Sequence, residues 1–212
     1  DDIDPPTGDG LDVHMGGEGF VCADCHTTRE HVISGKLYAA MPVGETDGHF
    51  TCRKCHEDVK HQAEEIDAHL ASVACETCHI PAVARANPTK TWWDWSTTKR
   101  NLHEVNDQNG KPQWSKKKGS FQWDRKYVPE YAWTNGAQDF YIKGKKITLT
   151  GDVLELNRQL GNIADPDSRI APFKVMRGRQ PYDVQQNILI VPKLYGPDGF
   201  WKTFDWEQSA RL

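Results

Sequence analysis

The stretch Cys22-Ala23-Asp24-Cys25-His26 dominates the interpretation of this chain, and its C-x-x-C-H spacing returns at residues 52–56 and 75–79. These three copies contain all six cysteines of the chain. In such a motif both thiols form thioether bonds to a haem, and the histidine that follows directly is the proximal iron ligand. The pattern therefore predicts three covalently bound haem c groups and no disulfide bond.

The predicted site residues follow from the motifs. The covalent attachment residues are Cys22, Cys25, Cys52, Cys55, Cys75 and Cys78, and the proximal ligands are His26, His56 and His79. The alternative is a zinc site built from CxxC pairs. Such a site would use two pairs and leave the third unexplained, and it makes no demand on the residue after the second cysteine. The haem interpretation accounts for all three copies.

The amino-acid composition indicates the broad class of protein. Hydrophobic residues make up 37% of the 212 residues, and the mean hydropathy is −0.72. This is little apolar surface for a core of side chains alone, so we expect haem to supply much of the core. The net charge is −4, to which haem propionates would add, and this argues against nucleic-acid binding.

Membrane insertion and location can also be judged from the sequence. The longest apolar run is residues 188–191, whereas a membrane-spanning helix needs about 18 apolar residues. The first residue is aspartate rather than methionine, so we expect a processed chain or a section of a longer protein. Haem is attached covalently outside the cytoplasm, so we expect a periplasmic or extracellular location.

The composition changes near residue 83. Every cysteine and eight of the nine histidines lie before this point, whereas all eight tryptophans follow it. We therefore expect a triple haem-binding region at residues 1–83 and a Trp-rich, haem-covering region without haem motifs at 84–212. The expected fold is a multihaem cytochrome c, mostly α and irregular around stacked haems. Its C-terminal part should be mixed, with short β-hairpins.

Low-spin electron-transfer haems need a second axial ligand, and several histidines are candidates. The distal candidates are His31 and His61, which each follow a motif, and His14 and His69, which each precede one. A histidine five residues after a proximal ligand reaches a neighbouring iron more easily than its own, so His31 and His61 are expected cross-ligands. Spacings of three and four predict a helix over residues 57–74, with His69 on its buried face. His49 is interpreted as a loop residue and His103 as solvated.

Three further patterns lie in the second part. Residues 141–156 predict a hairpin around Gly151-Asp152, and residues 157–182, which lack periodicity, are expected to form an ordered loop. The aromatic run Trp92-Trp93-Asp94-Trp95 is interpreted mainly as packing, with haem-edge stacking by one indole as the alternative.

With these residues identified, the chain resembles the octahaem tetrathionate reductase family of c-type cytochromes. The matching stretches are LDVHM at 11–15, VCADCHTT at 21–28 with His31, VACETCHIP at 73–81, TWWDWST at 91–97, PEYAW at 129–133 and FKVMRGRQPYD at 173–183. The resemblance implies a periplasmic oxidoreductase that reduces tetrathionate, nitrite or hydroxylamine. It also implies mostly bis-His haems and a Lys-ligated catalytic haem. The family has eight motifs and this chain has three, so it resembles the middle portion, with the catalytic haem outside it.

Two classes of function remain open at this level. One is electron relay within a larger reductase, in which no catalytic residue lies in this chain; the other is catalysis at one of its own haems. A stand-alone or polymeric extracellular electron-transfer cytochrome is a further alternative. The expected partners are an electron-donor cytochrome or quinol-oxidising protein, a further haem-bearing chain or subunit, and a small sulfur or nitrogen oxyanion substrate.

Overall fold

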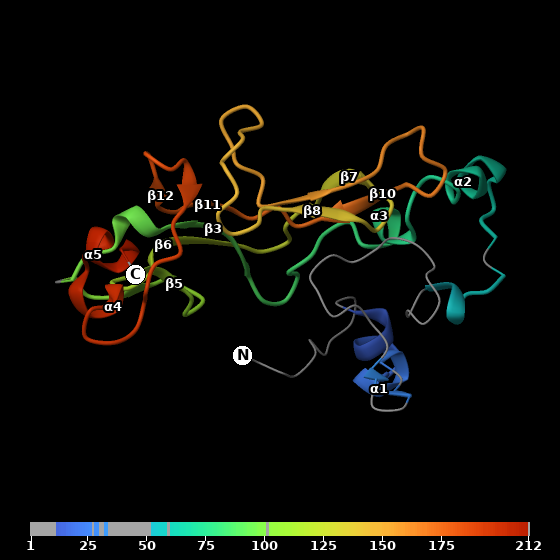
Figure 1. The fold of residues 1–212 in the computed structure, drawn as a ribbon. Helices are drawn as coiled ribbons and strands as arrows, with labels where there is room; N and C mark the ends of the chain where they lie inside the picture. The colour runs from blue at the N-terminus through green and yellow to red at the C-terminus, as the bar shows by residue number, and fades with distance from the viewer. Residues whose placement is uncertain are drawn as a thin grey trace. The chain divides into compact units, whose positions relative to one another are not determined.

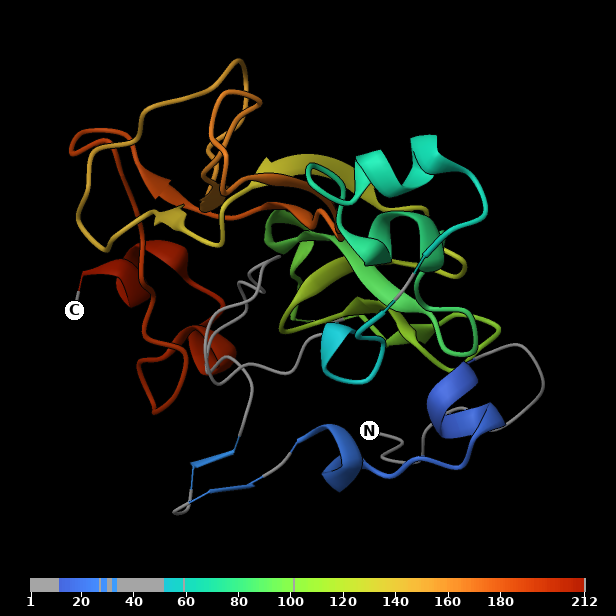
Figure 2. The same cartoon turned by 90° about the vertical axis from the view of Figure 1, so that its right-hand side faces the viewer.

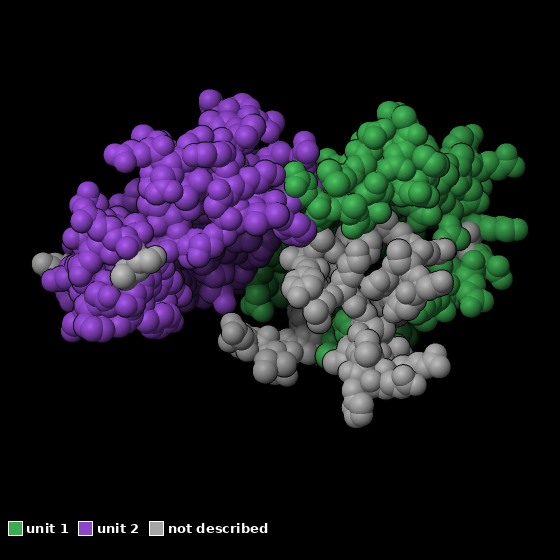
Figure 3. Space-filling view, in the orientation of Figure 1, with its two compact units in different colours: residues 1–87, 126–139, 159–173 green, residues 88–125, 140–158, 174–212 purple. Residues whose placement is uncertain are grey.

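The computed structural model describes residues 12–26, 28–29, 32–33, 52–58, 60–100 and 102–211. Two compact units are present (Figure 3): unit 1 contains residues 1–87, 126–139 and 159–173, and unit 2 contains residues 88–125, 140–158 and 174–212. Each unit is discontinuous in sequence. The division at residues 83 and 84 remains a prediction, since the structural units follow chain contacts rather than the distribution of haem motifs.

Unit 1 contains short helices and two small sheets. Its elements are η1 (Val13–Gly17), α1 (Cys22–Cys25), β1 (Thr28–Arg29), β2 (Val32–Ile33), η2 (Cys52–Lys54), α2 (Glu64–His69), α3 (Cys75–His79), β7 (Glu130–Thr134) and β10 (Arg169–Phe173). Strands β1 and β2 pair antiparallel, as do β7 and β10. Pro172 is accommodated in β10 because, among the described residues, β7 is the one strand that pairs with it.

Helix α3 is fixed to strand β10, beside which it lies in Figure 1. The carbonyl of Ile170 accepts hydrogen bonds from the Ala74 N–H and the Thr77 hydroxyl, both at 2.9 Å. Ala74 and Ala171 are the buried hydrophobic residues among the described part of unit 1, with 3% and 0% exposure. The third haem motif is thereby anchored to a rigid strand pair.

Unit 2 is built on a five-stranded sheet with the order β11-β3-β6-β5-β4. In Figure 2, strands β3 to β6 are green to yellow-green and β11 falls in the orange part of the colour scale. Its elements are β3 (Thr89–Asp94), η3 (Trp95–Thr97), β4 (Val105–Asn106), β5 (Pro112–Ser115), β6 (Gly119–Asp124), β11 (Arg177–Arg179), β12 (Tyr182–Asp183), β13 (Ile188–Leu189), α4 (Phe200–Thr203) and α5 (Trp206–Ala210). Strand β11 is parallel to β3, and the other pairs in this sheet are antiparallel. Strands β8 (Gln138–Phe140) and β9 (Asn157–Gln159) form a separate two-stranded sheet.

Aromatic and β-branched residues explain why residues 89–94 form strand β3, which lies inside the sheet between β11 and β6. The Trp95 ring stacks at 6.5 Å on Trp206, which in turn stacks at 3.7 Å on the buried Phe200. The packing interpretation of the aromatic run is therefore confirmed for Trp95. Trp93 likewise lies against Gly178 of strand β11.

Three expectations from the sequence need correction. The described residues contain more strands than helices, so the mostly α expectation is not met there. The helix predicted over residues 57–74 is limited to α2, because the Asp67 carboxylate binds the His61 N–H and Val73 instead bridges to Ile170. Residues 157–182, expected to be a loop, contain β9, β10 and β11.

Candidate haem-binding site

Each C-x-x-C-H motif lies on a single turn of helix. The three turns are α1, η2 and α3. Residues three apart on a helix share a face, so both thiols of a motif lie on the same side of their turn. The six thiols are free and are exposed or half-buried. This arrangement suits the attachment of one haem to each turn, through its two vinyl groups.

His14 and His56 lie side by side, although they come from different parts of the chain. Their ring centres are 6.2 Å apart with an angle of 64° between the planes. The Asp12 carboxylate caps the turn that carries His14, since it accepts hydrogen bonds from the N–H groups of His14 at 3.0 Å and Met15 at 2.7 Å. The Phe20 ring lies 5.6 Å from the His14 ring. A distal candidate that precedes the first motif thus faces the proximal histidine of the second.

His61 and His79 form a second pair, with ring centres 6.3 Å apart and an interplanar angle of 38°. Asp67 Oδ1 lies 2.9 Å from His61 Nδ1 and also accepts the His61 backbone N–H at 2.9 Å. These two hydrogen bonds hold the pKa of the Asp67 carboxyl below its usual value. A proton on Nδ1 leaves Nε2 free to ligate a metal.

Both separations fit an iron held between two imidazoles. Such an iron would place the ring centres about 6.4 Å apart, because each nitrogen would lie about 2 Å from the metal and roughly 1.2 Å from its ring centre. Each ring can rotate about its metal–nitrogen bond, so both interplanar angles are compatible with ligation. The donor sets of these two sites therefore fit haem.

The surroundings of the motifs also fit a large apolar group. Val21 is 59% exposed just before the first motif, Ile80 is 44% exposed just after the third, and Ile66 on α2 is 46% exposed. Each of these residues lies in or next to a segment that carries a predicted attachment residue or ligand, where a bound haem would cover it. The small side-chain core of unit 1 is consistent with the same requirement.

The turns of the second and third motifs are close together. Burial raises the pKa of the Cys52 thiol, with the Glu76 carboxylate, the Cys75 thiol and a hydrogen bond to Cys75 acting in the same direction. Cys52 and Cys75 belong to different motifs. The two predicted attachment turns therefore lie next to each other, which suits electron transfer between their haems.

The remaining histidines are placed as follows. His26 follows α1 and is exposed. His69 ends α2 and is exposed, so the expectation that it lies on a buried helix face is wrong. His103 is exposed, as predicted. His31 and His49 lie outside the described residues, and the role of His31 as a distal ligand stays a prediction.

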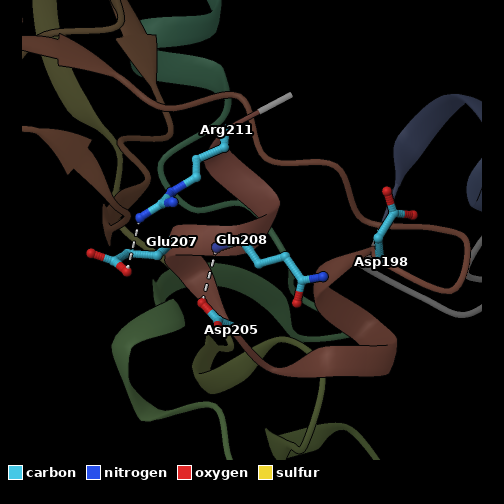
Figure 4. A pocket seen from close by; sticks show the side chains of 5 residues that line it. All are labelled: Asp198, Asp205, Glu207, Gln208 and Arg211. Carbon is cyan, nitrogen blue, oxygen red and sulfur yellow. Dashed lines mark hydrogen bonds and ion pairs between the residues drawn. The ribbon is translucent and has the colours of Figure 1, made fainter.

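A shallow pocket in unit 2 contains none of the predicted site residues (Figure 4). It is lined by Asp198, Asp205, Glu207, Gln208 and Arg211. In Figure 4 the Arg211 guanidinium pairs with Glu207 at 3.4 Å, and the Gln208 N–H donates to the Asp205 carboxylate at 2.9 Å. These contacts cap and support α5, so we assign the pocket no chemistry. Across the described ranges, no helix has the length and apolar character needed to cross a bilayer.

Asp12 and Asp67 are two residues that the sequence interpretation missed. An aspartate two residues before His14 is a recognisable capping signal. The signal for Asp67 is weaker, because its partner His61 lies six residues earlier and outside the helix. Sequence spacing alone does not show that the chain folds back between them.

Comparisons with known proteins agree with the haem chemistry. The family model described as bacterial cytochrome c matches residues 90–212, the part of the chain without attachment motifs. The crystal structure of octaheme cytochrome c from Shewanella oneidensis is similar with a TM-score of 0.83 and 43% identity, over 95% of this chain and 46% of that one. No curated protein matches.

The predicted resemblance to octahaem c-type cytochromes is thus confirmed, and the fold is that of a multihaem cytochrome c. Family membership together with the C-x-x-C-H motifs implies covalently bound haem c. The number of haems and the ligand of each iron stay predictions. On these grounds, the chain belongs to the bacterial cytochrome c family.

Proposed function

We propose that this chain passes electrons between three covalently bound haems as part of a larger periplasmic or extracellular reductase. Haem c, when bound, supplies reversible one-electron chemistry at its iron. The protein's own residues hold the groups in place through six thiols, three proximal histidines and the distal histidines. The catalytic haem lies outside this segment.

The pairing of histidines across motifs carries the proposal. His14 lies beside His56, and His61 lies beside His79, at the separation that a shared iron requires. An iron with two imidazole ligands has no open position for a substrate, which favours relay over catalysis at these two haems. Cys52 and Cys75 are in contact, so these two haems would have neighbouring attachment edges.

The remaining haem, which the first motif would hold at His26, has two distal candidates left. His31 is the cross-ligand suggested by its spacing, and His69 is exposed at the end of α2. An exposed imidazole could ligate a haem of another chain, which supports the alternative of a polymeric extracellular electron-transfer cytochrome. In either case a further haem-bearing chain or subunit is a partner.

The similarity to an octaheme cytochrome c supports membership in a larger assembly, because this chain spans 46% of that protein's length. By resemblance, the whole protein would reduce tetrathionate, nitrite or hydroxylamine. An electron-donor cytochrome or a quinol-oxidising protein would supply the electrons. The location follows from covalent haem attachment, which takes place outside the cytoplasm.

Two measurements on the haem-loaded 212-residue protein test the proposal. The ferric absorption and electron paramagnetic resonance spectra should show low-spin haem at the two paired sites. A viologen-dye assay should show rapid electron uptake but poor turnover of tetrathionate, nitrite or hydroxylamine beside a longer parent protein. Substantial turnover by this chain alone would move the active site onto one of its own haems.

A further inference from the structure

The carboxylate of Asp67 makes two hydrogen bonds to one candidate ligand. Its Oδ1 atom accepts the backbone N–H of His61 and lies within hydrogen-bond distance of His61 Nδ1, each at 2.9 Å. We propose that Asp67 is a positioning residue that fixes the His61 imidazole as the partner of His79 and lowers the reduction potential of the haem between them. This inference rests on the proposed function.

The two bonds restrict different motions of His61. The backbone bond holds the main chain at the start of the loop before α2, and the ring bond sets the rotation of the imidazole. With Nδ1–H directed at Asp67, the free Nε2 is the nitrogen available to iron. The ring lies 6.3 Å from His79, so both the tautomer and the position suit ligation.

A carboxylate bonded to Nδ1–H also changes the electron donation of the imidazole. It makes the ring a stronger donor, which stabilises ferric over ferrous iron and lowers the reduction potential. The side chains of His61 and Asp67 are 24% and 35% exposed, so the pair is partly shielded from water. Partial shielding keeps the interaction from being fully screened.

The other histidine pair has a different environment. The His14 ring contacts Phe20 and His56, while the nearby Asp12 carboxylate binds backbone N–H groups. The two irons should therefore differ in potential, with the His79 haem lower than the His56 haem. Electrons would then pass downhill from the third motif towards the second.

The test compares three variants of the haem-loaded chain by potentiometric titration of haem absorbance. Asp67→Asn keeps an oxygen that can accept the same hydrogen bonds but removes the charge. We expect it to raise the reduction potential of one haem by about 59 mV, which corresponds to a tenfold change in the ferric-to-ferrous ratio. Asp67→Glu keeps the charge and should retain the wild-type potential. Glu65→Gln removes one exposed charge from the same helix and should shift no haem comparably.

The outcomes separate this inference from the proposed function. If the Asp67→Asn protein stays low-spin and its haem potentials match those of Glu65→Gln, the role of Asp67 is overturned while the proposed function stands. An equal shift in Asp67→Glu would also overturn it, since local rearrangement would then explain the change. A high-spin haem at His79 in the wild-type protein would instead overturn the pairing of His61 with His79.

Discussion

Gly178 should not tolerate a methyl group, because the ring of Trp93 occupies that space. Gly178 in β11 is the register partner of Trp93 in β3. A Cβ atom at this glycine would lie 2.1, 2.4 and 2.5 Å from three atoms of the indole. Carbon atoms pack at about 3.5–4.0 Å, so the ring would have to move by more than about 1 Å. The backbone of Gly178 is not left-handed, so the constraint is one of space.

Overpacking of this kind costs roughly 1–3 kcal/mol. For a unit of roughly 100 residues, each kcal/mol lowers Tm by about 4–8 °C, so Gly178→Ala should lower the Tm of unit 2 by about 5–20 °C. Thermal unfolding followed by circular dichroism measures this directly. Gly17→Ala is the control, because its added Cβ would meet the Asp12 carbonyl oxygen at an ordinary 3.9 Å.

A double-mutant cycle with Trp93→Ala tests the cause. Removing the indole frees the space, so the penalty of Gly178→Ala should fall by more than about 1 kcal/mol in that background. A Gly178→Ala protein that unfolds within about 1 °C of the wild type would refute the packing argument. So would an undiminished penalty beside Trp93→Ala.

Three further outcomes are expected. Phe200→Ala should destabilise unit 2 by roughly 3–5 kcal/mol in urea titrations, because this 1% exposed ring stacks on Trp206; a loss below about 1 kcal/mol would contradict this. Hydrogen bonds lower the pKa of the Asp165 carboxyl in the folded protein; the bond from Ser168 has the largest effect, and Asn135 also contributes. The ionised carboxylate therefore stabilises the fold above the pKa of the unfolded state, and this stabilisation is lost as the pH falls through the lower pKa of the folded state. Asp165→Asn should therefore flatten the decline of Tm on acidification, and an unchanged decline would contradict the assignment. Replacing both cysteines of the first motif by serine should reduce the intact mass by one haem, and an unchanged haem count would refute attachment there.

Local sequence patterns predicted the parts of the fold that depend on nearby residues. The turn at Gly151-Asp152 forms, with Thr150 and Val153 bridged across it. Tyr141 donates its N–H to the Leu156 carbonyl, next to the paired strands β8 and β9, but no strand forms within residues 141–156. Ile147 instead donates its N–H to the Asn187 carbonyl. The alternation in this segment indicated the chain reversal but not the length of the pairing.

Long-range contacts explain why the loop predicted at residues 157–182 and the helix predicted over residues 57–74 were wrong. Strand β10 lies in a segment without periodicity, and its partner β7 ends more than thirty residues earlier in the chain. Residues 70–74 were predicted to continue a helix, but Val73 and Ala74 contact Ile170 instead. Pairings of this kind depend on tertiary structure rather than on local propensity.

In the candidate site too, the sequence predicted the features that depend on nearby residues and missed those that depend on long-range contacts. The motif spacing identified the attachment residues and proximal ligands, and the five-residue spacing suggested that His61 serves a neighbouring iron. The ring of His61 does lie beside His79 of the next motif, although its ligation stays a prediction. The closeness of His14 to His56 could not be read from the sequence, because 42 positions separate them.

The spin states of ferric single-histidine variants test the central claim most directly. Electron paramagnetic resonance and absorption spectra should be recorded for His14→Ala, His61→Ala and the exposed control His103→Ala. The account predicts that each of the first two variants converts one haem to high spin, while the control keeps the wild-type spectrum. If both His14→Ala and His61→Ala leave every haem low-spin, these histidines are not axial ligands and the relay assignment loses its basis.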